Sequence, residues 1–307
     1  MRDEGIAAVG AALVTVVAWG SAFVAIRAAG ETLSPGSIAL GRLLVSGAVL
    51  GGVALVRREP LPRRRDLAAI AVYGALWLGV YSVTLNAAER RIDAGTAAML
   101  INTGPVLIAV LAGLFLGEGF PPTLFAGCAV AFAGTALIGF AASESGTYET
   151  LGIVLCLIAA FAYACAVVVQ KPVLVRVSPF QLTWLGCAAA TFACLPFALA
   201  LVGELGDARG SAIGWTVYLG VVPTALGFAT WSFALRRMTA GRLAALAYLI
   251  PVVAIVLGWA FLDESPPWLA AVGGALCVGG VYLARRSPTA RSRPERFPSF
   301  PADRRGT

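Results

Sequence analysis

The sequence predicts an all-α integral membrane protein whose ten transmembrane helices form two inverted five-helix repeats. Three observations lead to this prediction: an apolar composition, ten apolar stretches of spanning length and an internal duplication. Of the 307 residues, 59% are hydrophobic and only 13% are charged. A soluble domain carries roughly 25% charged residues, so most of this chain must face lipid or other apolar helices.

The internal duplication relates the middle of the chain to its C-terminal third without a gap. The two copies lie 146 positions apart, since residue 236 in the second copy matches residue 90 in the first. The matched residues are Arg90-Arg91 and Arg236-Arg237, Ala94-Gly95 and Ala240-Gly241, Pro105 and Pro251, Glu118 and Glu264, Gly127 and Gly273, and Gly134 and Gly280. An offset of 144 relates the earlier parts more weakly and pairs Ser34-Pro35 with Ser178-Pro179. Such repeats in an apolar chain are typical of secondary transporters.

A helix that spans a membrane needs roughly 20 mostly apolar residues. Charged residues, prolines and glycines divide this chain into ten such stretches: 6–27, 36–56, 67–88, 94–117, 122–142, 151–170, 180–202, 211–235, 239–262 and 267–284.

Turn-forming and charged residues set the limits of the first five stretches. The first ends at Arg27, and Ser34-Pro35 opens the second. The segment 60–66 separates the second from the third, and the charged segment 89–93 is the only interruption before the fourth. The segment 118–122 then opens the fifth.

The last five stretches have limits of the same kind. The segment 143–150 precedes the sixth stretch, and Ser178-Pro179 opens the seventh. Arg209 precedes the eighth, and Arg236-Arg237 separates it from the ninth. The segment 264–267 leads into the tenth. The chain therefore divides into repeats over 6–142 and 151–284, followed by a basic tail over 285–307 that we expect to be disordered.

Positive charge predicts the orientation of these helices, because cytoplasmic loops are enriched in Lys and Arg. With the N-terminus in the cytoplasm, eleven Lys and Arg fall in inside loops and four in outside loops, the tail excluded. Five of the eleven lie in the segment 57–66. Both termini are then cytoplasmic. Because five helices per repeat is an odd number, the repeats insert in opposite directions, with a substrate site near the midplane.

The composition excludes several kinds of chemistry. The chain has no histidine, which removes His-based nucleophile pairs, metal sites and proton relays. The six cysteines lie in apolar runs without CxxC spacing and are interpreted as packing residues. We expect no enzyme activity, no metal, no cofactor and no nucleic-acid partner. No acid lies near a helix centre, so ion coupling would have to use helix-end groups such as Glu89, Asp93 or Glu118, and a facilitator is equally compatible.

Aromatic and polar residues within the stretches are candidates for a substrate cavity. Tyr73, Trp77 and Tyr81 follow one helical face of the third stretch, where they either line a cavity or pack between helices. Trp19, Tyr163 and Trp231 have the same two interpretations in the first, sixth and eighth stretches.

The fourth stretch holds the strongest polar candidate, Asn102, beside Thr103 and just before Pro105. A proline inside a helix removes a hydrogen bond and bends the chain. Asn102 either binds substrate or bonds a neighbouring helix. Pro251 repeats the expected kink in the ninth stretch, after Tyr248.

Arg42 is the only charged residue well inside a stretch. It either snorkels to the interface, forms structural hydrogen bonds, or anchors an anionic group of the substrate.

Several motifs resemble the EamA-type transporters of the drug/metabolite transporter superfamily. They are Ala18-Trp19-Gly20-Ser21-Ala22-Phe23-Val24-Ala25-Ile26-Arg27, Ser34-Pro35, Leu40-Gly41-Arg42-Leu43-Leu44, Asn86-Ala87-Ala88, Ala94-Gly95, Pro105, Gly117-Glu118, Pro121 and Gly127. The resemblance implies ten helices in two inverted repeats, cytoplasmic termini, and transport of small metabolites, amino acids or drugs, often outward. The second repeat departs from the first: Gly186 stands opposite Arg42, and Tyr248-Leu249 stands opposite Asn102-Thr103. We therefore expect a chemically asymmetric cavity.

Taken together, the residues and the resemblance predict a plasma-membrane exporter of small molecules that works by alternating access. The alternatives are an uptake carrier or facilitator for a small organic solute and, more distantly, a channel-like membrane protein. The oligomeric state is left open.

Overall fold

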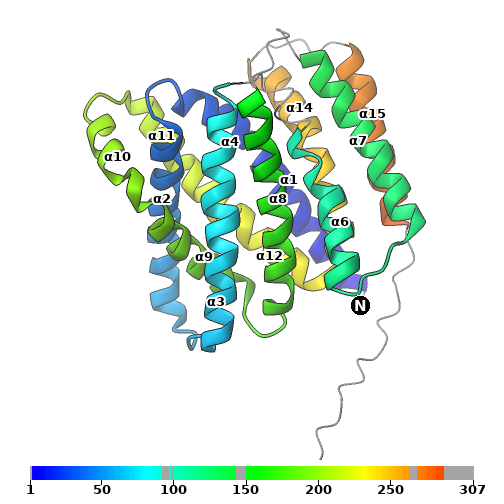
Figure 1. Ribbon diagram of the computed structural model, residues 1–307, viewed down its shortest axis with the longest axis horizontal. Helices are drawn as coiled ribbons and strands as arrows, with labels where there is room; N and C mark the ends of the chain where they lie inside the picture. The colour runs from blue at the N-terminus through cyan, green and yellow to red at the C-terminus, as the bar shows by residue number, and fades with distance from the viewer. Residues whose placement is uncertain (1, 92–96, 98–99, 143–149, 263–267, 287–307) are drawn as a thin grey trace, which may run out of the picture.

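The computed structural model describes residues 2–91, 97, 100–142, 150–262 and 268–286. All regular secondary structure in these residues is helical. The helices run side by side as an elongated bundle (Figure 1). The expected tail beyond residue 286 and the first residues of the expected stretch 94–117 lie outside the described part of the chain.

The helices in chain order are α1 (Arg2–Ala29), α2 (Pro35–Arg57), α3 (Arg64–Tyr73), the π-helix η1 (Gly74–Tyr81), α4 (Ser82–Ala88), α6 (Gly104–Phe115), α7 (Pro122–Ala142), α8 (Thr150–Val173), α9 (Pro179–Cys194), the 3₁₀ turn η2 (Leu195–Phe197), α10 (Ala198–Leu205), α11 (Gly210–Leu219), the π-helix η3 (Gly220–Leu226), α12 (Gly227–Arg237), α13 (Ala240–Leu246), the 3₁₀ turn η4 (Ala247–Leu249), α14 (Ile250–Leu262) and α15 (Trp268–Arg285).

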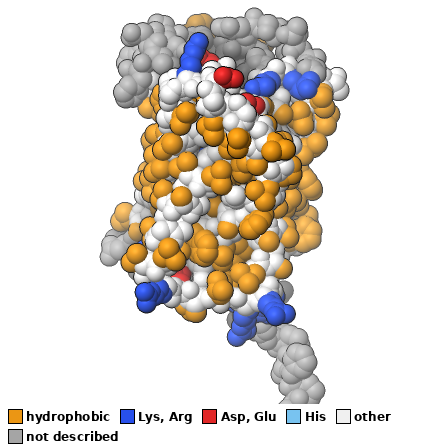
Figure 2. All heavy atoms as spheres, turned by 90° about the vertical axis from the view of Figure 1, so that its left-hand side faces the viewer, with side chains coloured by type: hydrophobic (Ala, Val, Ile, Leu, Met, Phe, Trp, Pro, Cys, Tyr) orange, Lys and Arg blue, Asp and Glu red, His pale blue; other side chains and the backbone are white. Residues whose placement is uncertain are grey.

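Length and hydropathy make this a multi-pass membrane protein. Six helical stretches of the described residues are long and apolar enough to cross a bilayer: Gly5–Ile26, Pro35–Arg57, Arg64–Ala88, Thr150–Val173, Pro179–Leu205 and Gly210–Arg237. Four shorter apolar helices accompany them: Gly104–Phe115, Pro122–Ile138, Ala240–Ala254 and Ala271–Ala284. Figure 2 shows hydrophobic side chains over the middle of one face and charged side chains gathered at its two ends. An apolar band between charged ends is the surface that a lipid bilayer requires.

Two of the long helices contain a π-helical segment at matching positions. In the stretch Arg64–Ala88 the segment η1 begins at Gly74, and in the stretch Gly210–Arg237 the segment η3 begins at Gly220, which is 146 residues later. In η3, Pro223 has no N–H to donate to the carbonyl of Leu219. The hydroxyl of Thr224 donates to that carbonyl instead, at 2.7 Å. Segments of this kind are frequent at functional sites.

Pro105 and Pro251 each follow a short irregular turn in a helical part of the chain. Pro105 is the second residue of α6 and follows a turn at Asn102 and Thr103, while Pro251 is the second residue of α14 and follows η4. The first turn of a helix has no partner for its N–H groups, so proline is well tolerated there.

Helices α7 and α15 form a close pair, side by side in Figure 1. A Cβ atom at Gly134 would fall 2.5 Å from the carbonyl oxygen of Gly273, and one at Gly127 would fall 2.6 Å from that of Gly280. As the residue number rises along α7, the number of the contacted residue falls along α15, so the two helices are antiparallel. Glycine at these positions lets the backbones touch, which is a common way to pack helices in membranes.

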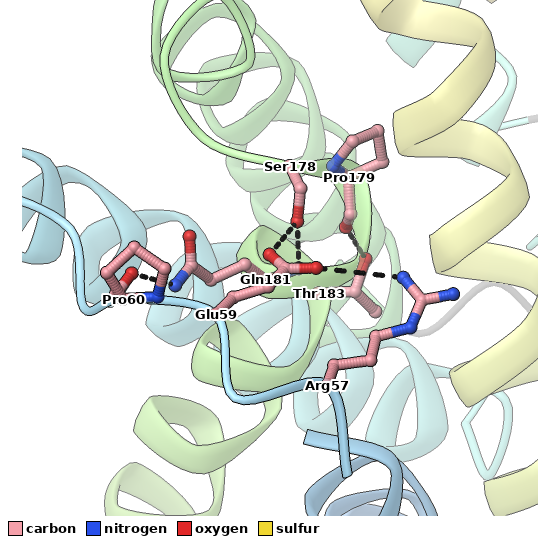
Figure 3. Close-up of polar contacts among 7 residues, drawn as sticks. All are labelled: Arg57, Glu59, Pro60, Ser178, Pro179, Gln181 and Thr183. Carbon is pink, nitrogen blue, oxygen red and sulfur yellow. Dashed lines mark hydrogen bonds and ion pairs between the residues drawn. The ribbon is translucent and has the colours of Figure 1, made fainter. Parts of the chain in front are cut away.

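Polar contacts join distant loops at the two ends of α2 and α9. At one end, the hydroxyl of Ser178 donates to Glu59 at 2.5 Å and Gln181 donates to the carbonyl of Pro60 at 2.7 Å (Figure 3). At the other end, the backbone N–H of Ser34 donates to Glu204 at 2.7 Å. Ser34 and Ser178 cap the N-termini of α2 and α9. The serine before α9 is thus bonded to Glu59 after α2, and the serine before α2 is bonded to Glu204 after α9.

Each of the two ends also carries an ion pair. Arg176 pairs with Asp66 at 2.5 Å, and Arg209 pairs with Glu31 at 3.0 Å. The hydrogen bond to Asp66 raises the pKa of Arg176 above its ordinary value. The two pairs differ in exposure: the side chain of Asp66 is 3% exposed, whereas both members of the other pair are more than half exposed.

This difference predicts unequal effects on stability. Asp66→Asn should lower the unfolding temperature in detergent by about 2–6 °C, because Arg176 would lose its charged partner in a buried ion pair. Glu31→Gln, the matched control, should change it by less than about 1 °C, because exposed ion pairs contribute little. Thermal unfolding of the two purified variants is the measurement. Equal shifts would show that burial of Asp66 is not what gives its pair its strength.

Candidate functional site

A cavity of about 90 Å³ lies inside the bundle, with room for several water molecules. Its wall is built from α1, α2, the η1–α4 stretch, the turn before α6, α8, α12 and the start of α14. The residues that line it are Trp19, Ala22, Ile26, Arg42, Trp77, Tyr81, Ser82, Leu85, Asn86, Ile101, Asn102, Pro105, Tyr163, Phe228, Ala247 and Ile250.

One side of the cavity is a wall of aromatic rings in mutual contact. The ring of Trp77 lies 4.7 Å from that of Tyr163 and 4.9 Å from that of Phe228, the second edge to face. Trp19 meets Trp77 edge to face at 5.6 Å. Its indole N–H donates to the carbonyl of Pro223 in η3 at 3.1 Å. Such contacts add to the energy of area burial and hold the rings in place.

The cavity wall also carries polar groups. Arg42 is 8% exposed, and its Nε donates to the hydroxyl of Thr224 at 2.8 Å. Asn86 donates to the carbonyl of Pro35 at 3.2 Å, while Asn102 is 9% exposed. The hydrogen bond between Arg42 and Thr224 is thus a contact inside the bundle. Among the described lining residues there is one cation and no carboxylate.

Five of the nine residues predicted to form a substrate cavity lie in its wall: Trp19, Trp77, Tyr81, Asn102 and Tyr163. Arg42 and Pro105 line it as well, whereas Pro251 does not.

The other four predicted cavity residues lie behind the wall or apart from it. Trp231 packs behind Trp19 at 5.1 Å and is 1% exposed. Tyr73 is fully buried, with its ring in the space that Gly186 leaves open. Thr103 donates its hydroxyl to the carbonyl of Leu100 at 2.7 Å, and Tyr248 is fully buried in the core.

Several lining residues were not predicted. Phe228 stands three positions before Trp231, and a three-residue spacing on a helix face could have indicated it. Ser82 and Asn86 are four residues apart in an apolar helix, which is the spacing of neighbours on one face. Ala247 and Ile250 carry no signal beyond their place before Pro251.

Glu118 and Lys171 have structural partners. Both carboxylate oxygens of Glu118 accept backbone N–H groups at the start of α13, from Ala240 at 2.7 Å and from Gly241 at 3.2 Å. The ammonium group of Lys171 donates to the carbonyls of Leu235 and Met238 at the end of α12. Together they hold the turn between α12 and α13, outside the cavity.

Comparisons with known proteins identify the relatives of this chain. The EamA-like transporter family matches the chain twice, over residues 6–140 and 150–286. A protein of Streptantibioticus cattleyicolor named "Probable terminal-alkyne amino-acid exporter" is 38% identical over 93% of this chain and 96% of its own length. The uncharacterized transporter YdfC of Bacillus subtilis is 32% identical over 86% of each chain. A protein of Escherichia coli named "Probable amino-acid metabolite efflux pump" is 25% identical over 92% of this chain and 94% of its own.

A solved crystal structure shares the fold with a TM-score of 0.75, at 22% identity, over 90% of this chain and 96% of that one.

Proposed function

Because this chain belongs to the EamA-like transporter family, we propose that it exports amino acids and related small metabolites across the plasma membrane by alternating access. The chain is a multi-pass membrane transporter and not an enzyme. The observation that carries the proposal is the internal cavity, which combines a rigid aromatic wall with one buried cation. The relatives named as exporters of amino acids or their metabolites support this class of substrate.

We further propose ten transmembrane helices in two inverted repeats, over 6–142 and 151–284. The sequence duplication and the double family match support this division. The π-helices η1 and η3 at equivalent positions also support it. The antiparallel pairing of α7 with α15, which end the two proposed repeats, is what a two-fold axis in the membrane plane would produce.

The proposed substrate site is the central cavity. It draws Trp19, Trp77 and Asn102 from the first repeat and Tyr163 and Phe228 from the second. A site shared between repeats can be exposed to either side of the membrane when they rock against each other. We assign Trp231, Tyr73, Tyr248 and Thr103 a supporting role behind this wall.

The excess of Lys and Arg in the segment 57–66 supports cytoplasmic termini. A single cysteine in place of Arg63 should therefore react with an impermeant maleimide only from the cytoplasmic side. Reaction at this position in intact cells would reverse the orientation.

Efflux from proteoliposomes tests the proposed function. Vesicles that contain the purified protein and are loaded with each of the twenty standard amino acids should release at least one of them with saturable, strongly temperature-dependent kinetics. An uptake carrier would show the same saturation, but cells that express the protein would then accumulate the substrate. Release that rises linearly with concentration would indicate a channel, and release of none of them would refute amino-acid export.

The cavity wall predicts a role for Asn102 in transport. Asn102→Leu should reduce flux per folded molecule by about tenfold, the loss expected when one good ligand hydrogen bond is removed. Flux normalised to monodisperse protein in detergent is the measurement. Thr103→Val is the matched control and should leave flux unchanged, because the Thr103 hydroxyl is already bonded to the nearby backbone carbonyl of Leu100. If Asn102→Leu loses folded protein in proportion to flux, Asn102 is structural.

A further inference from the structure

Arg42 is an unusual residue to find inside a membrane bundle. It stands in α2, is 8% exposed and faces the cavity. A buried cation in a membrane protein normally pairs with an acid or serves a functional site, because its desolvation is costly. Among the residues that the structure describes, no aspartate or glutamate forms an ion pair with Arg42.

We propose that Arg42 makes the cavity selective for substrates that carry one carboxylate, and that Thr224 is the residue that positions its guanidinium group. This inference rests on the proposed function and adds what the site recognises.

The direction of the hydrogen bonds shows how Thr224 can do this. A threonine hydroxyl has one hydrogen and two lone pairs. In Thr224 the hydrogen is donated to the carbonyl of Leu219 at 2.7 Å, which leaves the oxygen to accept from Nε of Arg42 at 2.8 Å. The Leu219 carbonyl is available because Pro223 has no N–H. The hydrogen bond to Leu219 in turn orients the Thr224 hydroxyl, and this hydroxyl holds the guanidinium of Arg42 at its Nε atom.

The bond from Nε leaves the two terminal nitrogens of Arg42 for a ligand. Side by side, they form the planar fork that binds both oxygens of a carboxylate. A lysine ammonium could supply the charge but neither the fork nor the bond to Thr224. The residue that matches Arg42 in the second repeat is Gly186, so the cavity has one such anchor.

The segment η3 also holds Trp19. The carbonyl of Pro223 accepts the indole N–H of Trp19 at 3.1 Å. Trp19 and Trp77 line the cavity together with Arg42, so aromatic rings are available to the rest of a ligand whose carboxylate binds Arg42. An ammonium group or an apolar side chain suits such faces. A second carboxylate would meet no second cation among the described lining residues, so monocarboxylates should be preferred to dicarboxylates.

Competition experiments test the selectivity. In proteoliposomes, efflux of the best-transported amino acid should be inhibited by that amino acid at least about tenfold more strongly than by its own amide. Arg42→Gln should remove this preference, and Arg42→Lys should restore only part of it. Thr224→Val should reduce the preference several-fold, whereas Thr224→Ser, which keeps the hydroxyl, should preserve it. Equal inhibition by acid and amide in the native protein would overturn the proposal.

A binding measurement separates this inference from the proposed function. Benzoate should raise the unfolding temperature of the purified native protein, benzamide should not, and Arg42→Gln should abolish the effect of benzoate. Benzoate binding without amino-acid efflux would support the anchor and refute the exporter. Efflux with no difference between acid and amide would support the exporter and refute the anchor. A Thr224→Val protein that is less stable but equally selective would show that Thr224 is only structural.

Discussion

Inside a membrane, a backbone carbonyl that loses its helical partner must find another donor, since no bulk water is available. The cavity of this protein depends on how that requirement is met at Pro223. The carbonyl of Leu219 accepts a hydrogen bond from the Thr224 hydroxyl, whose oxygen accepts one from Arg42. The carbonyl of Pro223 itself is taken by Trp19. One irregular segment therefore holds a side chain from each of two other helices, and both side chains line the cavity.

At the two ends of the bundle, hydrogen bonds join the two proposed repeats. Ser34 and Ser178 begin equivalent helices, and each is bonded to an acid that follows the helix of the opposite repeat, Glu204 or Glu59. These contacts lie at the two ends of the antiparallel pair formed by α2 and α9. The proposed inverted duplication would account for these two matching contacts, because a two-fold axis relates each contact between the repeats to an equivalent position. Differences between counterparts, such as Arg42 and Gly186, are then the places where function departs from symmetry.

The sequence was sufficient to predict the helical membrane fold and the family, because both depend on the length of apolar stretches and on repeated motifs. Trp77 and Tyr81 could be predicted for the cavity because they share a face of one long helix. Tyr73 lies on the same predicted face but fills the space at Gly186, and only the packing of α9 against η1 reveals this. The partner of Arg42 could not be predicted, because Thr224 is 182 positions away and faces it through a π-helical turn. Phe228 was missed because an apolar residue in an apolar helix gives no signal of its own.

If the cavity is the substrate site and opens to each side of the membrane in turn, its wall should be reachable from both sides and protected by the substrate. The direct measurement uses a protein without its six native cysteines and with one cysteine in place of Ser82, a lining residue. An impermeant maleimide is applied to right-side-out and to inside-out vesicles, with and without transported amino acid. We expect labelling from both sides, slowed in each case by the substrate. Labelling from one side only, or at a rate that the substrate does not change, would contradict alternating access at this cavity.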